Sequence, residues 1–235
     1  MTTLLIATRN AHKVGEIQAI LGEGFACRAL LKEFPAAPVA IEDADTFAGN
    51  ALKKAESLSI WLACLTPKAR GGLSAERMFI LADDSGLEVD ALGGAPGVHS
   101  ARFAAMDSGH EGNSQDPENN AKLLRLLAGV SKAKRTGRFR CVLALVEVNS
   151  GRADLPVGPD ARQRVPTTPQ LFDGACEGWI DFAPRGSGGF GYDPLFIPLG
   201  QEKSFAELGE SVKNGLSHRA KALAKLRDWF SGGSY

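Results

Sequence analysis

A hydroxyl, an amide and an ammonium group stand close together near the start of the chain, on Thr8, Asn10 and Lys13. A short apolar run precedes them and apolar residues at helical spacing follow, which predicts a strand-to-helix turn. Backbone N–H groups and the helix dipole favour an anion at such a turn, and these donors suit phosphate oxygens. A plain helix cap with a solvated lysine explains the same residues, and this segment alone favours that simpler interpretation.

Two adjacent carboxylates, Asp83 and Asp84, directly follow the apolar run from Phe79 to Ala82, so we predict them at the end of a buried strand. Adjacent carboxylates repel each other and need a cation, hydrogen bonds or water. A hard cation such as Mg²⁺ prefers oxygen ligands and also binds phosphate. An acid-rich turn fits the pair equally well. An upstream acidic run that begins at Glu42 offers a further ligand, although such runs are usually solvated loops.

The segment from Gly186 to Pro194 reads G-S-G-G-F-G-Y-D-P and formally contains G-x-G-x-x-G. A dinucleotide-binding fingerprint must open a helix after a strand, and Pro194 argues against a helix here. We therefore predict a flexible loop that brings the backbone close to a ligand and offers Phe190 or Tyr192 for stacking on a base. A glycine-rich turn with two core aromatic residues is an equally good interpretation.

A basic group formed by Lys213, His218 and Arg219 is predicted at the start of the last helix, which Ser217 caps. Helix N-termini favour acidic side chains, so cations there indicate a nearby anionic or carbonyl-rich ligand. No single motif decides the function. Together the motifs supply phosphate donors, a metal site and a platform for a base, which is what a Mg²⁺–nucleotide needs.

The elements that must position these motifs predict a mixed α/β fold without strict alternation of strands and helices. The expected strands are 4–7, 79–82, 139–148 and 178–182. The expected helices follow Asn10, run from Phe47 to Leu65, open at Asp116-Pro117 and follow Ser217. Polar stretches at 66–77 and 149–170 predict exposed loops.

Composition limits the class of protein. The 235 residues, 44% hydrophobic and 23% charged, predict one globular domain over 1–235, with two lobes. The 27 basic residues balance the 27 acidic ones, which argues against nucleic-acid binding. The apolar runs are too short for a membrane span or a secretory signal. The four cysteines are widely spaced, so we expect no disulfide or zinc scaffold and a cytoplasmic location.

The ordered motifs resemble those of the inosine triphosphate pyrophosphatase family from Leu4 to about Phe230. They read T-x-N-x-x-K at 8–13, E-x-x-x-T-F at 42–47, N-A-x-x-K-A at 50–55, A-D-D-S-G-L at 82–87, L-G-G-A-P-G at 92–97 with S-A-R at 100–102, G-G-F-G-Y-D-P at 188–194, and Lys213 with S-H-R at 217–219. The resemblance implies an elongated fold, in which helices flank a mixed central sheet and the substrate cleft lies between two lobes. It also implies a homodimer.

The resemblance further implies Mg²⁺-dependent hydrolysis of the purine nucleotides ITP, dITP and XTP to the monophosphate and pyrophosphate. By position, the residues that would hold the triphosphate are Thr8, Asn10, Lys13 and Lys54. Glu42 and Asp84 would hold Mg²⁺, Asp84 would also activate water, and Asp83 would support the metal ligands. Ser85 would touch the substrate and Phe190 would stack on the base. The remainder of the nucleotide pocket would be Gly191, Tyr192, Asp193, Lys213, His218 and Arg219.

Selectivity for the base would depend on the group at position 6 of the purine ring. Hypoxanthine and xanthine carry a 6-oxo group where adenine carries a 6-amino group, so a hydrogen-bond donor aimed at this position would reject adenine. His218 and Arg219 are the two candidates for that donor. One alternative function is a nucleotide pyrophosphatase with a different base preference. Another is a nucleotide- or RNA-binding module without turnover, but such a module does not need the carboxylates at 42, 83 and 84.

Overall fold

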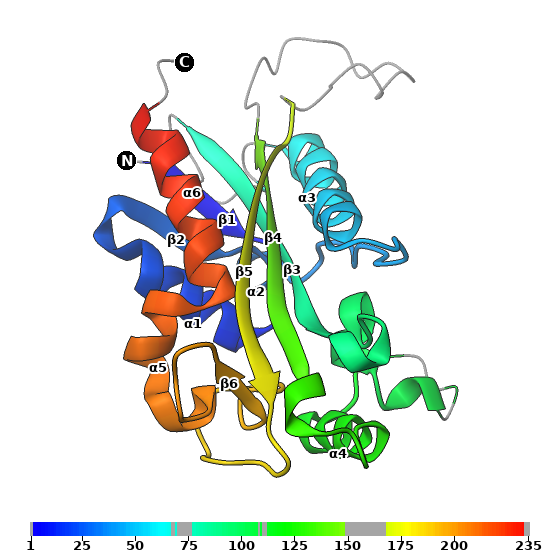
Figure 1. The fold of residues 1–235 in the computed structure, drawn as a ribbon. Helices are drawn as coiled ribbons and strands as arrows, with labels where there is room; N and C mark the ends of the chain where they lie inside the picture. Colours follow the sequence, from blue (N-terminus) through cyan, green and yellow to red (C-terminus); the bar gives the residue numbers. More distant parts are fainter. Residues whose placement is uncertain are drawn as a thin grey trace. The chain divides into compact units, whose positions relative to one another are not determined.

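The computed structural model describes residues 2–66, 69, 77–107, 109, 112–148 and 168–232 (Figure 1). The strands are β1 (Thr2–Ile6), β2 (Phe25–Ala29), β3 (Met78–Val89), β4 (Thr136–Glu147), β5 (Gln170–Ile180) and β6 (Phe196–Pro198), hydrogen-bonded in the order β2-β1-β3-β4-β5-β6. β1 pairs in parallel with β2 and β3, whereas β5 and β6 are antiparallel. The predicted mixed sheet and α/β fold class are therefore confirmed. The chain forms two compact units, the first made of Met1–Asp83 and Leu143–Phe172, the second of Asp84–Val142 and Asp173–Tyr235.

The first unit opens with a parallel strand–helix–strand arrangement. Its elements are β1 (Thr2–Ile6), α1 (Ala11–Leu21), β2 (Phe25–Ala29), α2 (Leu30–Glu33), α3 (Phe47–Cys64) and the start of β3 (Met78–Val89). The first helix begins after Asn10, whose side chain accepts from two backbone N–H groups, and ends at Gly22. Thr46 caps α3 by accepting the Gly49 N–H. Both helices and the cap of α1 agree with the sequence prediction.

The second unit contains the rest of β3 and most of the later elements. These are α4 (Asp116–Leu126), β4 (Thr136–Glu147), β5 (Gln170–Ile180), β6 (Phe196–Pro198), α5 (Phe205–Leu216) and α6 (His218–Gly232), together with the short 3₁₀ turns Asp90–Leu92, Gly97–Arg102, Ala105–Asp107 and Lys132–Lys134. β4 ends in the first unit, and β5 begins there. The final helix is capped by Ser217, whose hydroxyl accepts the Ala220 N–H.

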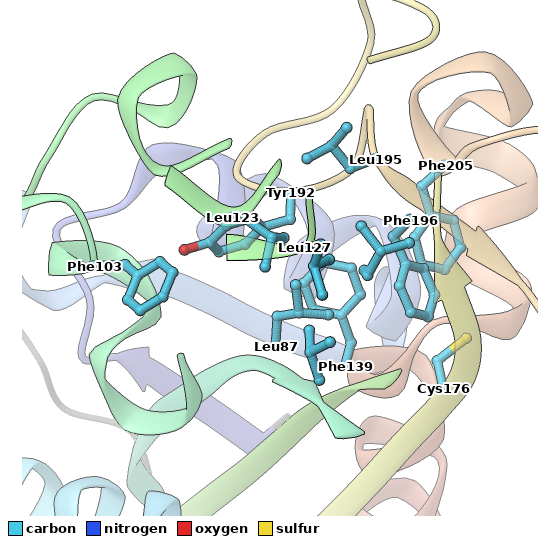
Figure 2. Close-up of a cluster of buried hydrophobic side chains, with 12 residues drawn as sticks. Leu87, Phe103, Leu123, Leu127, Phe139, Cys176, Tyr192, Leu195, Phe196 and Phe205 are labelled. Atoms are coloured by element: carbon cyan, nitrogen blue, oxygen red, sulfur yellow. The ribbon is translucent and has the colours of Figure 1, made fainter. Parts of the chain in front are cut away.

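One cluster of buried side chains forms the core of the second unit (Figure 2). The Phe139 and Phe196 rings lie 4.8 Å apart edge to face, and Phe196 stacks on Phe205 at 5.4 Å. Burial of one large apolar side chain contributes about 1.5–3 kcal/mol, so this cluster is a strong anchor. Tyr192 and Leu195 belong to the same cluster. The glycine-rich segment before them is therefore attached to a rigid base.

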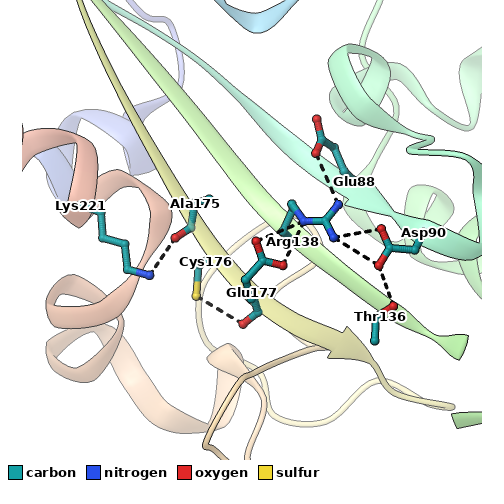
Figure 3. Close-up of polar contacts among 8 residues, drawn as sticks. All are labelled: Glu88, Asp90, Thr136, Arg138, Ala175, Cys176, Glu177 and Lys221. Carbon is teal, nitrogen blue, oxygen red and sulfur yellow. Dashed lines mark hydrogen bonds and ion pairs between the residues drawn. The ribbon is translucent and has the colours of Figure 1, made fainter. Parts of the chain in front are cut away.

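Arg138 joins three strands on another face of the second unit (Figure 3). Its guanidinium lies 2.9 Å from the Glu177 carboxylate on β5 and 3.0 Å from Asp90, just after β3. A longer contact of 3.8 Å reaches Glu88. The guanidinium is partly exposed, so water screens these ion pairs, and they set strand register more than they stabilise the fold.

Several expected elements differ from the structure. β3 does not end at Ala82 but continues through Asp83 and Asp84 to Val89. β5 begins at Gln170 rather than Gly178, and β2, β6 and α5 were not predicted. The predicted loops at 66–77 and 149–170 fall almost entirely outside the described residues. All four cysteines are free thiols, as expected. No helix among the described residues is long and apolar enough to cross a membrane.

Candidate functional site

The turn between β1 and α1 carries the first candidate residues. Asn10 accepts the backbone N–H groups of His12 at 2.9 Å and Lys13 at 3.2 Å, and Thr8 Oγ1 accepts the Asn10 N–H at 3.2 Å. These bonds satisfy N–H groups that the first turn of a helix otherwise leaves without partners. The predicted helix cap is therefore confirmed, but the predicted solvated lysine is wrong, because Lys13 pairs with Asp83. The cap does not exclude an anion site, because the positive end of the helix dipole lies at the same turn.

Lys13 and Lys54 both contact Asp83 within the first unit. Lys13 Nζ lies 2.5 Å from Asp83 Oδ1, and Lys54 Nζ donates to the Asp83 carbonyl oxygen at 3.0 Å. Lys54 also lies 3.1 Å from Glu42 Oε2. The Asp83 side chain is completely buried, whereas 41% of the Glu42 side chain is exposed. We call these four residues, with Thr8 and Asn10, the lysine cluster.

Asp83 and Asp84 do not form the carboxylate pair at a strand end that the sequence predicted. They lie within β3, where consecutive side chains point to opposite faces of the sheet. The sequence reasoning failed because Asp, Ser and Gly are uncommon in strands, so the run A-D-D-S-G resembled a turn. Asp83 belongs to the first unit and Asp84, also buried, to the second. Among the described residues no three His, Cys, Asp or Glu side chains gather as a metal site.

The segment 186–194, here called the aromatic loop, forms no helix, as predicted. The Phe190 N–H donates to Asp193 Oδ2 at 2.9 Å, and Lys213 Nζ lies 2.6 Å from the same oxygen. Lys213 Nζ also lies 4.3 Å from the centre of the Phe190 ring, a cation–π contact. Only 3% of the Lys213 side chain and 2% of the Asp193 side chain are exposed. Asp193 and Lys213 therefore hold the backbone and the ring of Phe190.

The next residues of the aromatic loop are tied to α4 and to the turn at 97–102. Gly191 N–H donates to Asp116 Oδ2 at 2.6 Å, and Asn120 Nδ2 donates to the Gly191 carbonyl at 3.0 Å. The Tyr192 hydroxyl donates to the Ser100 carbonyl at 2.9 Å. Burial, with a smaller contribution from the Asp116 charge, raises the pKa of Tyr192. The sequence indicated Asp116 only as a helix start and did not indicate Asn120, because no local pattern reports such distant contacts.

The basic group predicted at one helix start is split between two helices. Lys213 lies in the last turn of α5, where a cation is favourable, so the argument from the helix N-terminus was wrong for Lys213. Arg219, in the first turn of α6, is almost fully buried. Its Nη2 donates to Ser85 Oγ at 3.0 Å and its Cζ lies 6.0 Å from the Phe190 ring centre. The neighbouring His218 ring stacks on Phe139 at 4.9 Å.

The structure thus places Asp193, Lys213 and Arg219 beside Phe190, and Arg219 also contacts Ser85. It places the His218 ring on Phe139 and the Tyr192 hydroxyl on Ser100 instead. We call the predicted nucleotide-pocket residues of this unit the base group: Ser85, Phe190, Gly191, Tyr192, Asp193, Lys213, His218 and Arg219. A pocket of about 670 Å³ in the same unit lies elsewhere, beside Asp90, Val130 and Thr136. No candidate residue lines that pocket, so it provides no support for a substrate site.

Comparisons with known proteins show the family to which the chain belongs. The model of the Ham1 family matches residues 4–229. A dITP/XTP pyrophosphatase of Geobacillus kaustophilus is 44% identical over 227 residues, which cover 96% of this chain and 93% of that protein. The dITP/XTP pyrophosphatase of Shouchella clausii is 40% identical over 233 residues, covering 99% and 98%.

Solved structures give the same result for the fold. The Staphylococcus aureus Ham1 protein superposes with a TM-score of 0.72 at 29% identity and covers 98% of each chain. A HAM1 protein from Coxiella burnetii has a TM-score of 0.72 at 32% identity, covering 99% of this chain and 100% of that one. The resemblance inferred from the sequence motifs is confirmed, and the chain belongs to the Ham1 family.

Proposed function

We propose that this protein is a nucleoside triphosphate pyrophosphatase that hydrolyses the non-standard purine nucleotides ITP, dITP and XTP to the monophosphate and pyrophosphate. Relatives that align over nearly the whole chain bear the name dITP/XTP pyrophosphatase. The residues at the corresponding motifs have the chemistry that this reaction needs. The lysine cluster binds the triphosphate, and the base group binds the purine.

The contact of two lysines with Asp83 carries this proposal. Lys13 and Lys54 bring two positive charges to one residue, beside the positive end of α1. Their side chains are 15% and 11% exposed, so neither lysine is completely buried. Charge-assisted hydrogen bonds to phosphate are among the stronger polar contacts in proteins. A triphosphate, with several negative charges, is the ligand that makes the fullest use of them.

The carboxylates suit a divalent metal, and we propose Mg²⁺ as the cofactor. Glu42 and Asp84 offer carboxylate oxygens, the ligand type that Mg²⁺ prefers. Mg²⁺ commonly binds through one or two carboxylates together with substrate phosphates, so a cage made only of protein side chains is not required. When bound, Mg²⁺ neutralises phosphate charge and polarises the phosphorus–oxygen bonds.

The proposed reaction is the attack of water on the α-phosphorus. The water oxygen forms a bond to phosphorus, and the bond to the bridging oxygen breaks, so that pyrophosphate leaves. Asp84 accepts a proton from the attacking water, as a general base. Lys13 and Lys54 stabilise the negative charge that collects on the leaving pyrophosphate.

Arg219 is the stronger candidate for the donor to the 6-oxo group of the base. Its guanidinium lies near the Phe190 ring on which the base would stack and already donates to Ser85. The His218 ring, in contrast, packs against Phe139 in the core cluster. Adenine presents an amino group at the same position, so the guanidinium would face a second donor and ATP would be rejected.

We also propose that the protein acts as a homodimer in the cytoplasm and binds no nucleic acid. The balanced charge supports the last point, because nonspecific nucleic-acid binding depends on an excess of basic residues. Light scattering of the purified protein measures the oligomeric state directly.

The function is tested by product analysis. The purified protein is incubated with ITP, dITP, XTP, ATP, GTP and a pyrimidine triphosphate, with and without Mg²⁺, beside the variant Asp84→Asn. Asp173→Asn is the matched control, because Asp173 lies on the surface and pairs with Lys225. We expect Mg²⁺-dependent release of pyrophosphate from ITP, dITP and XTP, retained in Asp173→Asn and lost in Asp84→Asn.

Each other outcome would indicate a different function. Orthophosphate as the first product would mean that a different bond is cleaved. Faster turnover of ATP or a pyrimidine nucleotide would indicate a pyrophosphatase with another base preference. Saturable binding without any product would indicate a binding module.

A further inference from the structure

Two side chains on one face of α4 hold a single residue of the aromatic loop. Asp116 and Asn120 are four positions apart, so they are neighbours on the helix surface. Asp116 accepts the Gly191 N–H at 2.6 Å, and Asn120 donates to the Gly191 carbonyl at 3.0 Å. The N–H belongs to the peptide that joins residues 190 and 191, and the carbonyl to the peptide that joins 191 and 192. Two consecutive peptide planes are therefore fixed.

Fixing these planes matters because the residue between them is glycine. Gly191 has φ +64, and a side chain added there would meet open space, so packing around it does not restrict its backbone. Glycine has the widest choice of backbone angles of all residues. Without the two hydrogen bonds, the peptide that joins residues 190 and 191 would keep only the longer bond from the Asp193 N–H to the Phe190 carbonyl, at 3.3 Å. Asp193 and Lys213 hold Phe190, which precedes this glycine, and the two α4 side chains hold the glycine itself.

The two contacts with Gly191 are separate from the hydrogen bonds that support the start of the helix. Asn120 is almost fully buried, and its bond to Gly191 spans 71 positions of the sequence. The neighbouring Asn119 contacts a different segment, accepting the Ala104 N–H and donating to the Ala101 carbonyl. The helix start is supported separately by Glu118, which accepts the Gln115 N–H at 3.1 Å. Asp116 and Asn120 are thus available to the aromatic loop.

We infer that Asp116 and Asn120 are positioning residues that hold Gly191 so that the Phe190 ring is in place to stack on the purine base. The inference rests on the proposed function. It makes α4 one of the elements that determine the affinity for the base, although this helix carries none of the motif residues. Neither residue needs to touch the substrate.

The test separates base binding from phosphate binding. The variants Asp116→Ala and Asn120→Ala are compared with the matched control Glu118→Ala, which removes the same charge as Asp116→Ala from the same helical turn. For each protein we measure kcat and KM with ITP, and the inhibition constant of inorganic triphosphate, which has no base. Circular dichroism establishes that each variant is folded.

Each anchor variant should raise the KM for ITP about two- to tenfold, the range for one lost hydrogen bond, and should change kcat much less. The inhibition constant of triphosphate should stay at the wild-type value. Asp116→Asn keeps an acceptor oxygen and should restore a near-wild-type KM. Since Asp116 is exposed, Asp116→Ala is expected to fold even if Asn120→Ala does not.

Three results would overturn the inference: an unchanged KM for ITP in both anchor variants, the same change in Glu118→Ala, or equal weakening of ITP and triphosphate. A wild-type protein that released no pyrophosphate from ITP would instead overturn the proposed function, and the inference with it.

Discussion

Each unit of this molecule contains a lysine that lies against a carboxylate among the candidate residues, but the surroundings of the two pairs differ. In the first unit Lys54 lies 3.1 Å from Glu42, whose side chain is 41% exposed. In the second unit Lys213 lies 2.6 Å from Asp193, and both side chains are at least 97% buried. The Phe190 N–H and ring further enclose the second pair.

The difference shows that the same pair of charges can serve two purposes. Water reaches the Glu42 carboxylate, so Lys54 is able to exchange this carboxylate for a phosphate at little cost. Separation of the buried pair would leave an uncompensated charge away from water. We therefore assign Lys54 to ligand binding and Lys213 chiefly to the structure of the aromatic loop. Lys13 with Asp83 is intermediate, because the carboxylate is buried and the lysine reaches solvent.

The largest effect should come from removal of one partner of the buried pair. Lys213→Met should lower the free energy of unfolding by about 3–5 kcal/mol, the usual range for an uncompensated buried charge. Lys225→Met is the matched control, since Lys225 pairs with Asp173 on the same unit and both side chains are more than half exposed. Its effect should be below about 1 kcal/mol. Urea unfolding measures both, and equal small losses would contradict the assignment.

A pair of glycines tests how tightly Asp193 is enclosed. Gly189 and Gly191 both have positive φ, at +72 and +64, so alanine should cost about 1–2 kcal/mol at either position. A Cβ at Gly189 would also overlap the Asp193 carboxylate, whereas a Cβ at Gly191 meets nothing. Gly189→Ala should therefore destabilise the protein more than Gly191→Ala in thermal unfolding. The reverse order would mean that the carboxylate is free to move.

Loss of the pair between Lys54 and Glu42 should affect ligand binding more than folding. Lys54→Met should raise the KM for ITP and ATP alike by about 10- to 100-fold, the range for a lost hydrogen bond to a charged group. Its free energy of unfolding should change less than in Lys213→Met, because Glu42 stays hydrated and only the bond to the Asp83 carbonyl is lost. Lys53→Met is the control on the same helix, since Lys53 pairs with the exposed Asp43 and should alter neither property. A large loss of stability in Lys54→Met would remove the contrast with Lys213.

The smallest effect concerns alkaline pH. Burial raises the pKa of Tyr192 above its ordinary value of 10.0, so the unfolded chain loses this proton at lower pH than the folded protein does. The folded state then binds more protons, and stability should fall as the pH rises through and above about 10. Tyr192→Phe should show a shallower fall in urea unfolding between about pH 9 and 11. Identical slopes would mean that the phenol is accessible to water.

Local signals explain which elements the sequence could predict. Asn10 and Gly22 bound α1, and Thr46 opens α3, because caps act within a few residues of the helix end. The continuation of β3 through Asp83 depends instead on tertiary contacts with Lys13 and Lys54, which outweigh the weak strand preference of aspartate. Helix α5 has apolar residues at helical spacing, but it contains Gly209 in a non-helical conformation and Gly215, and glycine disfavours helix, so it was not predicted.

The candidate site shows the same limit. Its residue types were visible in the motifs, including Phe190 and Arg219, because the motifs occur as short runs. Which residues contact one another was not, because Asp116 and Gly191 are 75 positions apart and Arg219 and Ser85 are 134 apart. The sequence therefore indicated which side chains to examine. Only the folded chain shows that Lys213 holds the loop while Lys54 pairs with the exposed Glu42.

The central claim is that the lysine cluster recognises the triphosphate and the base group recognises the purine. The most direct test is kcat/KM for ITP and for ATP in the wild type, Lys54→Met and Arg219→Ala. We expect Lys54→Met to lower both values by the same factor, so that the ITP-to-ATP ratio is unchanged, and Arg219→Ala to lower the ratio. Equal changes of the ratio in the two variants, or an unchanged ratio in Arg219→Ala, would contradict the division of roles.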